Sequence, residues 1–169
     1  MRFRKIAAAV GLLGAVNASA QTARPRVFTP GDMAPEAPSV DVWLDQGSYG
    51  YGQPIRPSFA SDPGAYVTIV RVTTDGEMRV MYPRRPDLQE RYSPGRTVDT
   101  RISYAGSPTF NVYESRGTGF VFAIASYDAF DYSYFRIGSE WRTARLASSG
   151  RYGDPFEIIR MFIEQTLSE

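Results

Sequence analysis

The sequence predicts an all-β domain: an Ig-like or related β-sandwich of about seven strands, with a C-terminal α-helix packed on it. From residue 40 onward, short runs of β-branched and aromatic residues alternate with glycine- and proline-containing turns. An Asp-Gly pair at 75–76 separates two of these runs, as in a tight hairpin. The last part of the chain has the apolar spacing of an amphipathic helix.

Residues 1–20 have the three parts of a signal peptide. Arg2, Arg4 and Lys5 form a basic head, residues 6–16 are apolar, and Ala18-Ser19-Ala20 is a small-residue cleavage site. An apolar run of about eleven residues is too short to cross about 30 Å of hydrocarbon, which takes about 20. No cysteine follows for a lipid anchor. We therefore expect a periplasmic or secreted protein with no transmembrane segment after cleavage.

Residues 21–39 differ in composition from the rest of the chain. They hold Pro25, Pro30, Pro35 and Pro38, and proline fixes φ and donates no backbone hydrogen bond. The segment is predicted to be a proline-rich linker, or alternatively an arm pinned to the domain by Val27 and Phe28. Residues 40–169 are then expected to form a single domain.

After cleavage the chain would contain no histidine, cysteine or lysine, because Lys5 is its only lysine. This excludes Cys, His and Lys nucleophiles, Ser-His pairs, Cys/His zinc sites and disulfides. Loss of the three basic residues of the leader leaves 16 basic residues against 18 acidic ones. Such a balance gives no reason to expect a nucleic-acid partner.

The first expected strand, residues 40–44, alternates apolar and polar side chains. Residues 46–53 contain three glycines and two tyrosines and are predicted to form a loop. Residues 55–60 are expected to form a weak strand, which Pro57 confines to an edge or a bulge.

The strongest local prediction is a hairpin between residues 66–72 and 78–82, with its turn at 74–77. Residues 83–96 form a proline- and arginine-rich connection. Further strands are expected at 98–104, 110–113 and 119–126. The last of these is apolar almost throughout, as in a central strand covered on both faces.

A short helix is expected around residues 140–146, and the chain ends in a helix predicted at 154–168. Asp154 can cap this helix, Pro155 suits its first position, and Glu157 has the spacing of a capping box. Its apolar stripe should pack on the β core. A helix that binds a partner or a membrane surface is the alternative.

Residues 64–83 combine a Gly-x-Tyr strand start, the Asp75-Gly76 turn and a second strand ending in Tyr82-Pro83. With the later strand ending in Ala-Ser at 125–126, this pattern resembles the bacterial family known as domain of unknown function 4384, over roughly residues 43–126. The family usually has Asn after the proline, where this chain has Arg84. The resemblance implies a small sandwich-like domain of envelope or secreted proteins, sometimes attached to kinases or peptidases, with no catalytic residues.

The matched residues also have physical roles of their own. Gly64 and Gly76 permit backbone conformations that other residues resist. Tyr66 and Tyr82 can bury a ring and keep the hydroxyl at a wet rim. We therefore assign Gly64, Tyr66, Asp75, Gly76, Tyr82 and Pro83 to specifying the fold.

Two groups of side chains are candidates for ligand or partner contact. The first is an aromatic run that forms either an exposed platform or a second small core under the C-terminal helix: Tyr127, Phe130, Tyr132, Tyr134 and Phe135. The second is a set of arginines that could bind an anion, or could simply lie on a solvated loop: Arg84, Arg85, Arg91 and Arg96.

Asp128 and Asp131 lie within the aromatic run. They could serve as the paired carboxylates of a glycosidase or as oxygen ligands for calcium, or they could be solvated loop residues. No catalytic residue, metal ligand or cofactor is assigned.

The sequence thus favours an exported, non-catalytic binding or structural module of the bacterial cell envelope. Its expected partner is an envelope protein or polysaccharide. The alternatives are a carboxylate-dependent polysaccharide hydrolase and a calcium-stabilised adhesion module.

Overall fold

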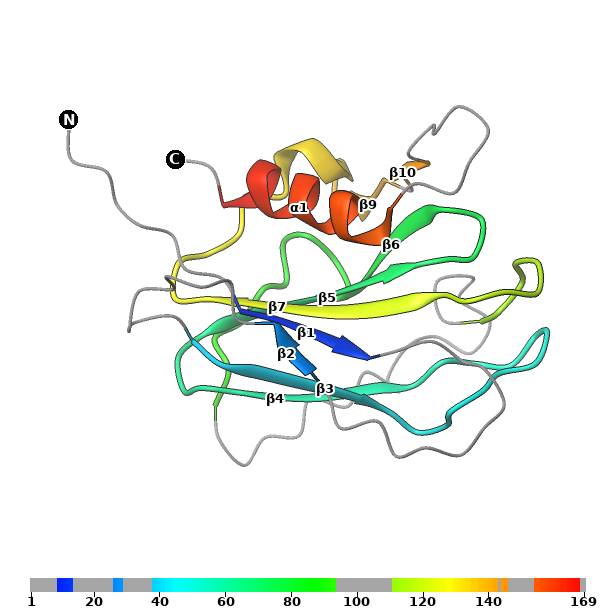
Figure 1. Cartoon of the computed structure of the whole chain (residues 1–169). Coiled ribbons are helices and arrows are strands. Elements are labelled where there is room, and N and C mark those ends of the chain that lie inside the picture. Colours follow the sequence, from blue (N-terminus) through cyan, green and yellow to red (C-terminus); the bar gives the residue numbers. More distant parts are fainter. Residues whose placement is uncertain are drawn as a thin grey trace.

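The computed structural model describes residues 9–13, 26–28, 38–93, 111–142, 144–145 and 154–167. It consists mostly of strands in small antiparallel sheets, with one C-terminal helix, so the mainly-β class is confirmed (Figure 1). The largest sheet has six strands in the order β10-β6-β5-β7-β1-β2, and β3-β4 and β8-β9 form two further sheets. The strands are β1 (Ala9–Leu13), β2 (Arg26–Phe28), β3 (Val40–Leu44), β4 (Pro57–Ser61), β5 (Tyr66–Val72), β6 (Glu77–Tyr82), β7 (Phe120–Ser126), β8 (Arg136–Ile137), β9 (Glu140–Trp141) and β10 (Ala144–Arg145); the helix is α1 (Pro155–Thr166), and a short 3₁₀ helix, η2, spans Ser133–Phe135.

The predicted hairpin is confirmed as β5 and β6, which pair antiparallel. Its turn is closed by hydrogen bonds from the Thr73 N–H to the Glu77 carbonyl (2.9 Å) and from the Gly76 N–H to the Thr73 carbonyl (3.0 Å). Gly76 has φ = 78°, a left-handed conformation that a Cβ would strain. The Asp-Gly pair therefore places the turn where the sequence predicted it.

Strand β7 is central, as its apolar sequence predicted. It pairs along its whole length with β5, from Tyr66↔Ser126 to Val72↔Phe120, and its other edge pairs with β1. Every residue of β7 after Phe120 is buried. A strand buried on both faces has no need of polar alternation, which explains the continuous apolar run.

Part of the predicted signal peptide lies in the sheet. Residues 9–13, in its apolar core, form β1, which pairs antiparallel with β7. Residues 26–28, in the predicted linker, form β2, which pairs with β1. If residues 1–20 are removed as the sequence predicts, β1 would be lost from this sheet.

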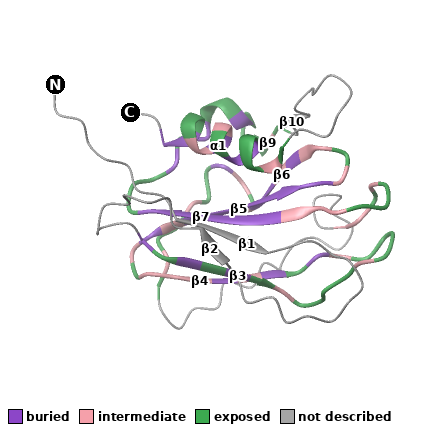
Figure 2. Ribbon diagram, in the orientation of Figure 1, coloured by how far each residue is buried: buried purple, intermediate pink, exposed green. Residues whose placement is uncertain are grey.

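The main sheet is covered on both faces (Figures 1 and 2). On one face, α1 and the 130–135 segment pack against Val70, Phe122 and Ile124. On the other face, β3 and β4 bury Val42 and Phe59 against the opposite side of β5 and β7. Alternate residues of β5 and β7 therefore contribute to two separate apolar clusters. We call the cluster under α1 the helix-side core and the cluster under β3 and β4 the β3–β4-side core.

Helix α1 begins where its capping signals predicted. The Asp154 side chain accepts a hydrogen bond from the Phe156 N–H (2.9 Å), and Pro155 is the first helical residue. Ile158, Ile159 and Phe162 are buried in the helix-side core. The helix therefore docks on the β core, as expected. Within the described residues, no helix is long and apolar enough to span a membrane.

Two expectations about local structure change. The short helix predicted near residues 140–146 is wrong, because Glu140–Trp141 is strand β9 and pairs with β8. The predicted strand at 110–113 is represented by an isolated bridge between Asn111 and Pro54. The predicted strand at 98–104 lies outside the described residues.

The two tryptophans of the chain lie in different layers. Trp43, on β3, is 47% exposed. Trp141, on β9, packs against the helix-side core, and its indole N–H donates to the carbonyl of Pro83 (2.9 Å).

Candidate functional site

The predicted aromatic run divides between core and surface. Phe130, Tyr132 and Phe135 are buried beneath α1, which agrees with the interpretation of a second small core. Tyr127 and Tyr134 are exposed. The five rings therefore do not form one exposed platform.

Tyr132 is held in this core by a hydrogen bond with the Thr68 hydroxyl of β5. Burial raises the pKa of Tyr132, and the hydrogen bond with the Thr68 hydroxyl acts in the opposite direction. Its phenol therefore stays neutral and serves packing.

The predicted arginine group does not converge on one point in the part that the structure describes. Arg85 pairs with Asp87 (2.6 Å), and Arg91 lies over the Tyr66 ring, 5.4 Å from its centroid. Arg84 is exposed, and Arg96 lies outside the described residues. The three described side chains, Arg84, Arg85 and Arg91, therefore lie along a connection rather than around a single ligand position.

The residues assigned to fold specification are placed as follows. Gly64 has φ = 80°, so it too lies in the left-handed region. Asp75 precedes Gly76 in the β5–β6 turn. The rings of Tyr82 and Phe59 pack 5.1 Å apart, and Tyr66 ends the pairing of β5 with β7.

Asp128 and Asp131 are both exposed. The Asp131 carboxylate accepts hydrogen bonds from the hydroxyl and backbone N–H of Ser133, which lower its pKa. Among the described residues, no group of three or more acidic side chains could hold a metal ion.

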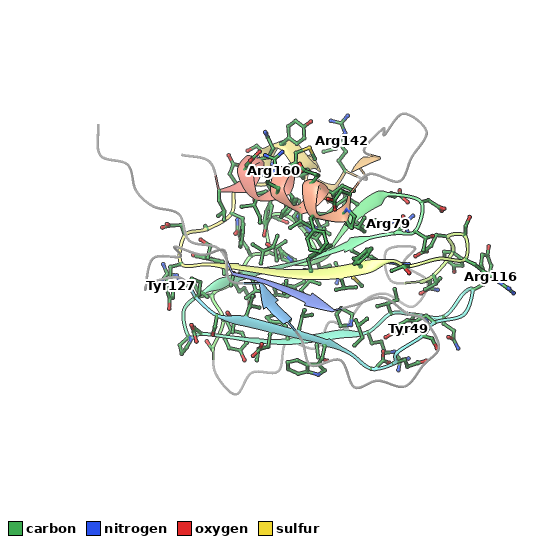
Figure 3. The ribbon with its side chains drawn as sticks, in the orientation of Figure 1. Tyr49, Arg79, Arg116, Tyr127, Arg142 and Arg160 are labelled. Atoms are coloured by element: carbon green, nitrogen blue, oxygen red, sulfur yellow. The ribbon has the colours of Figure 1, made fainter. Side chains whose placement is uncertain are left out.

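A different region of the molecule contains two crevices. We call it the loop end: residues 45–54, the turn at 73–77 and the segment 111–119. In Figure 3, Tyr49 and Arg116 mark this end of the molecule, and Tyr127 lies at the opposite end. A crevice of about 230 Å³ includes Thr73, Thr74 and Arg116 in its lining, and a second of about 80 Å³ includes Tyr49, Arg71 and Glu114.

The segment 111–119 is tied to its neighbours on both sides. The Thr74 hydroxyl donates to the carbonyl of Ser115 (2.8 Å), and a Cβ on Gly117 would lie only 3.2 Å from the Thr74 methyl group. On the other side, the Gly52 N–H donates to the Val112 carbonyl (2.7 Å). The absence of a side chain at Gly117 therefore favours this close approach, because a Cβ would force the Thr74 side chain to shift.

A buried ion pair holds the same segment against strand β5. Arg71, on β5, is 1% exposed, and its guanidinium pairs with Glu114 and donates to the Asn111 carbonyl (3.1 Å). The second oxygen of Glu114 accepts from the Tyr113 N–H (3.0 Å). Burial lowers the pKa of Arg71, and the Glu114 carboxylate opposes this shift. A charged side chain at the end of the central hairpin thus anchors residues 111–114.

Two tyrosines of the loop end, Tyr51 and Tyr113, are exposed. Tyr51 is 78% exposed and Tyr113 is 47% exposed, and their rings meet edge to face with centroids 5.5 Å apart. The amide of Asn111 donates to the Tyr113 hydroxyl (3.0 Å), which orients that ring. In the same loop, Tyr49 donates its hydroxyl proton to Asp45 (2.6 Å). Burial, together with this hydrogen bond, raises the pKa of Tyr49.

The sequence interpretation missed this site, although a signal was present. Residues 46–53 and 111–119 combine tyrosine, serine and asparagine with several glycines. Recognition loops of antibodies have this composition, because tyrosine gives rigid contact area and the small residues adapt. What the sequence could not give is that the two stretches meet at one end of the sheet.

No protein-family model, curated protein or solved structure matches this chain. The likeness to domain of unknown function 4384 therefore rests on the residues quoted for it alone.

Proposed function

We propose that this chain is an exported, non-catalytic binding module of the bacterial cell envelope, and that it contacts its partner through the loop end. The observation that carries the proposal is the exposed Tyr51–Tyr113 pair, which belongs to loops whose neighbouring residues, among them Tyr49 and Glu114, line a crevice. Exposed aromatic side chains grouped next to a concave surface are typical of interfaces.

The physical advantage of this arrangement is pre-organisation. A tyrosine has few rotatable bonds, so fixing it at an interface costs little conformational entropy. Here the backbone beneath Tyr113 is already fixed by Arg71 and Glu114, and the Tyr113 ring is oriented by Asn111. Most of the ordering that binding requires is therefore present before the partner arrives.

Three further features support the proposal. The first twenty residues have the organisation of a signal peptide. The pattern over residues 64–83 resembles an envelope-associated family. The covering of the main sheet by β3 and β4 favours the sandwich-like arrangement that this resemblance implies.

The partner that best suits the loop end is another envelope protein. Tyrosine rings beside hydroxyl groups, backbone carbonyls and one exposed guanidinium, that of Arg116, are common at protein interfaces. An envelope polysaccharide would meet the same groups, and the test below separates the two.

The test compares capture of envelope components by the cleaved protein and by a double variant, Tyr51→Ala with Tyr113→Ala. Because exposed tyrosines at an interface centre often dominate affinity, the variant should lose capture at least about tenfold. The matched control replaces Tyr127 and Tyr134, which are exposed outside the loop end, and should capture as the wild type does.

Protease or glycosidase treatment of the envelope fraction then identifies the class of partner. Protease-sensitive capture supports a protein, and glycosidase-sensitive capture would replace it with a polysaccharide. Equal capture by the loop-end variant and the wild type would contradict the proposal.

A further inference from the structure

We propose that removal of the leader opens a strand-sized slot along β7, and that an extended apolar segment of another envelope protein fills it. This rests on the export part of the proposed function, but it uses a different surface from the loop end. The slot is defined by what occupies it in the full chain, namely β1.

The pairing between β1 and β7 is continuous. Five consecutive residue pairs run antiparallel from Ala9↔Ala125 to Leu13↔Val121. Residues 9–13 belong to the leader, so cleavage after residue 20 would leave the backbone groups along this edge of β7 without their partner strand. An unpaired strand edge is a template for another strand.

The character of β7 makes an open edge unfavourable. Phe122 and Ile124 belong to the helix-side core, whereas Val121, Ala123 and Ala125 belong to the β3–β4-side core. No charged side chain lies within the strand to discourage pairing, and it contains no proline. Proteins usually protect long apolar edges of this kind by covering or pairing them.

The geometry around the slot favours a single donated strand over a second copy of the whole domain. Strand β3 contacts both β1 and β7, so it would cover one face of any strand that occupied the slot. Figure 1 shows β1 close to both of these strands. An edge-to-edge dimer through β7 would have to accommodate a second β3–β4 layer next to the first at the shared edge. A lone strand needs only the width of β1.

The occupant's chemistry follows from the segment that fits the slot. Residues 9–13 read Ala-Val-Gly-Leu-Leu, an uncharged run of small and aliphatic side chains. The donated segment should therefore be extended, uncharged, at least as long as β1, and antiparallel to β7. In such complexes the main-chain hydrogen bonds supply affinity and the side-chain positions supply specificity.

Hydrogen exchange over residues 120–126 tests the proposal in three samples: the full chain, the cleaved chain from the envelope fraction, and the cleaved chain with a synthetic peptide of residues 7–15. Exchange should be at least about tenfold faster after cleavage, and the peptide should restore the protection. A peptide with both Val10→Pro and Gly11→Pro should fail, because one of two consecutive strand residues directs its N–H toward β7 and proline cannot donate there. Helix α1, residues 155–166, serves as the internal reference.

Several results would contradict the proposal that cleavage opens the edge of β7. Full protection of 120–126 in the cleaved chain alone would mean that the chain closes its own edge, for example with β2. If the cleaved chain is unfolded, recovery of its circular dichroism on adding the peptide supports the proposal, and no recovery refutes it. An envelope-derived protein whose intact mass retains residues 1–20 would also refute it.

These results are distinguishable from failure at the loop end. The cleaved Tyr51→Ala, Tyr113→Ala variant should regain protection with the peptide as the wild type does, whatever its capture of envelope components. Retention of the leader, seen by intact mass, would remove the slot and the export proposal but would leave binding at the loop end testable.

Discussion

Tyr132 and the Tyr51–Tyr113 pair have opposite surroundings. Tyr132 lies in an aromatic cluster beneath α1, where its hydroxyl bonds to Thr68 and its ring stacks on Phe130. Tyr51 and Tyr113 instead lie exposed on glycine-containing loops, and their rings contact each other edge to face. Three rings of the dense aromatic run therefore build a core, whereas Tyr51 and Tyr113, among glycines, are exposed.

The comparison teaches that aromatic density alone does not identify a binding surface. A cluster of rings close in sequence can bury itself against a neighbouring helix, as Phe135 does against Phe162 at a centroid distance of 4.8 Å. A ring among small residues has fewer neighbours to cover it. Substitutions in the aromatic core should therefore reduce stability, and ring substitutions at the loop end should reduce binding.

The largest effect should come from Phe162→Ala. Phe162 is fully buried in the helix-side core, so truncation should lower the free energy of unfolding by about 3–5 kcal/mol. Urea denaturation with an unchanged m-value measures this loss. A loss below about 1 kcal/mol would mean that α1 does not depend on this core.

Arg71→Met tests whether the loop end needs its buried anchor. Removing the guanidinium leaves Glu114 without its ion-pair partner, so we expect a loss of about 3 kcal/mol in urea unfolding. Hydrogen exchange should also increase in residues 111–114. The double variant with Glu114→Gln should lose less, because no unpaired carboxylate remains. A double variant that loses more than Arg71→Met would contradict this explanation.

Gly76→Val tests the turn that supports the larger crevice. Gly76 has φ = 78° and open space around it, so the cost comes from backbone strain alone and should be about 1–3 kcal/mol in thermal or urea unfolding. Gly47→Val is the matched control, because Gly47 also has open space but no positive φ, and should change stability by less than about 0.5 kcal/mol. Equal effects of the two changes would show that the turn is misassigned.

Tyr132→Phe tests the core hydroxyl and its pH dependence. Near neutral pH we expect a loss of about 1–2 kcal/mol, because the Thr68 hydroxyl loses its partner. Burial raises the pKa of Tyr132, so the stability this phenol confers is present below the ordinary tyrosine pKa of about 10 and falls as pH rises above it. As pH rises from 8 to 11, the urea midpoint should therefore fall less steeply for the variant than for the wild type. Parallel pH dependences of the two midpoints would mean that Tyr132 is exposed to solvent.

The smallest effect on stability should come from Tyr51→Ala. Its ring is 78% exposed, so unfolding should change by less than about 0.5 kcal/mol, although partner capture falls. Differential scanning calorimetry beside the capture assay measures both. A large loss of stability with unchanged capture would reverse the proposed roles of Tyr132 and the Tyr51–Tyr113 pair.

The elements that the sequence predicted well carry local signals. The β5–β6 hairpin follows from its Asp-Gly turn, the start of α1 follows from Asp154 and Pro155, and the central position of β7 follows from its apolar run. Each signal lies within a few residues of the structure that it specifies.

The candidate site could not be predicted in the same way, because it depends on contacts between distant segments. The bond between Arg71 and Glu114 joins residues 43 positions apart, and that between Thr74 and Ser115 joins residues 41 apart. Arg71 also stands in a strand whose neighbours are apolar, so its sequence context does not show that its charge is buried with a partner. The short helix expected at 140–146 failed for a related reason, because the pairing of β8 with β9 outweighed local helix propensity.

The placement of the two indoles gives this chain a pair of optical reporters. Trp43 lies on β3, in the β3–β4 layer. Trp141 packs against the helix-side core, and its indole N–H is hydrogen-bonded to the Pro83 carbonyl. Replacing either one by phenylalanine leaves a single fluorophore, so the emission of Trp43 would follow the β3–β4 layer and that of Trp141 the helix layer. Melting curves recorded at the two positions would then reveal whether the layers separate together or one after the other.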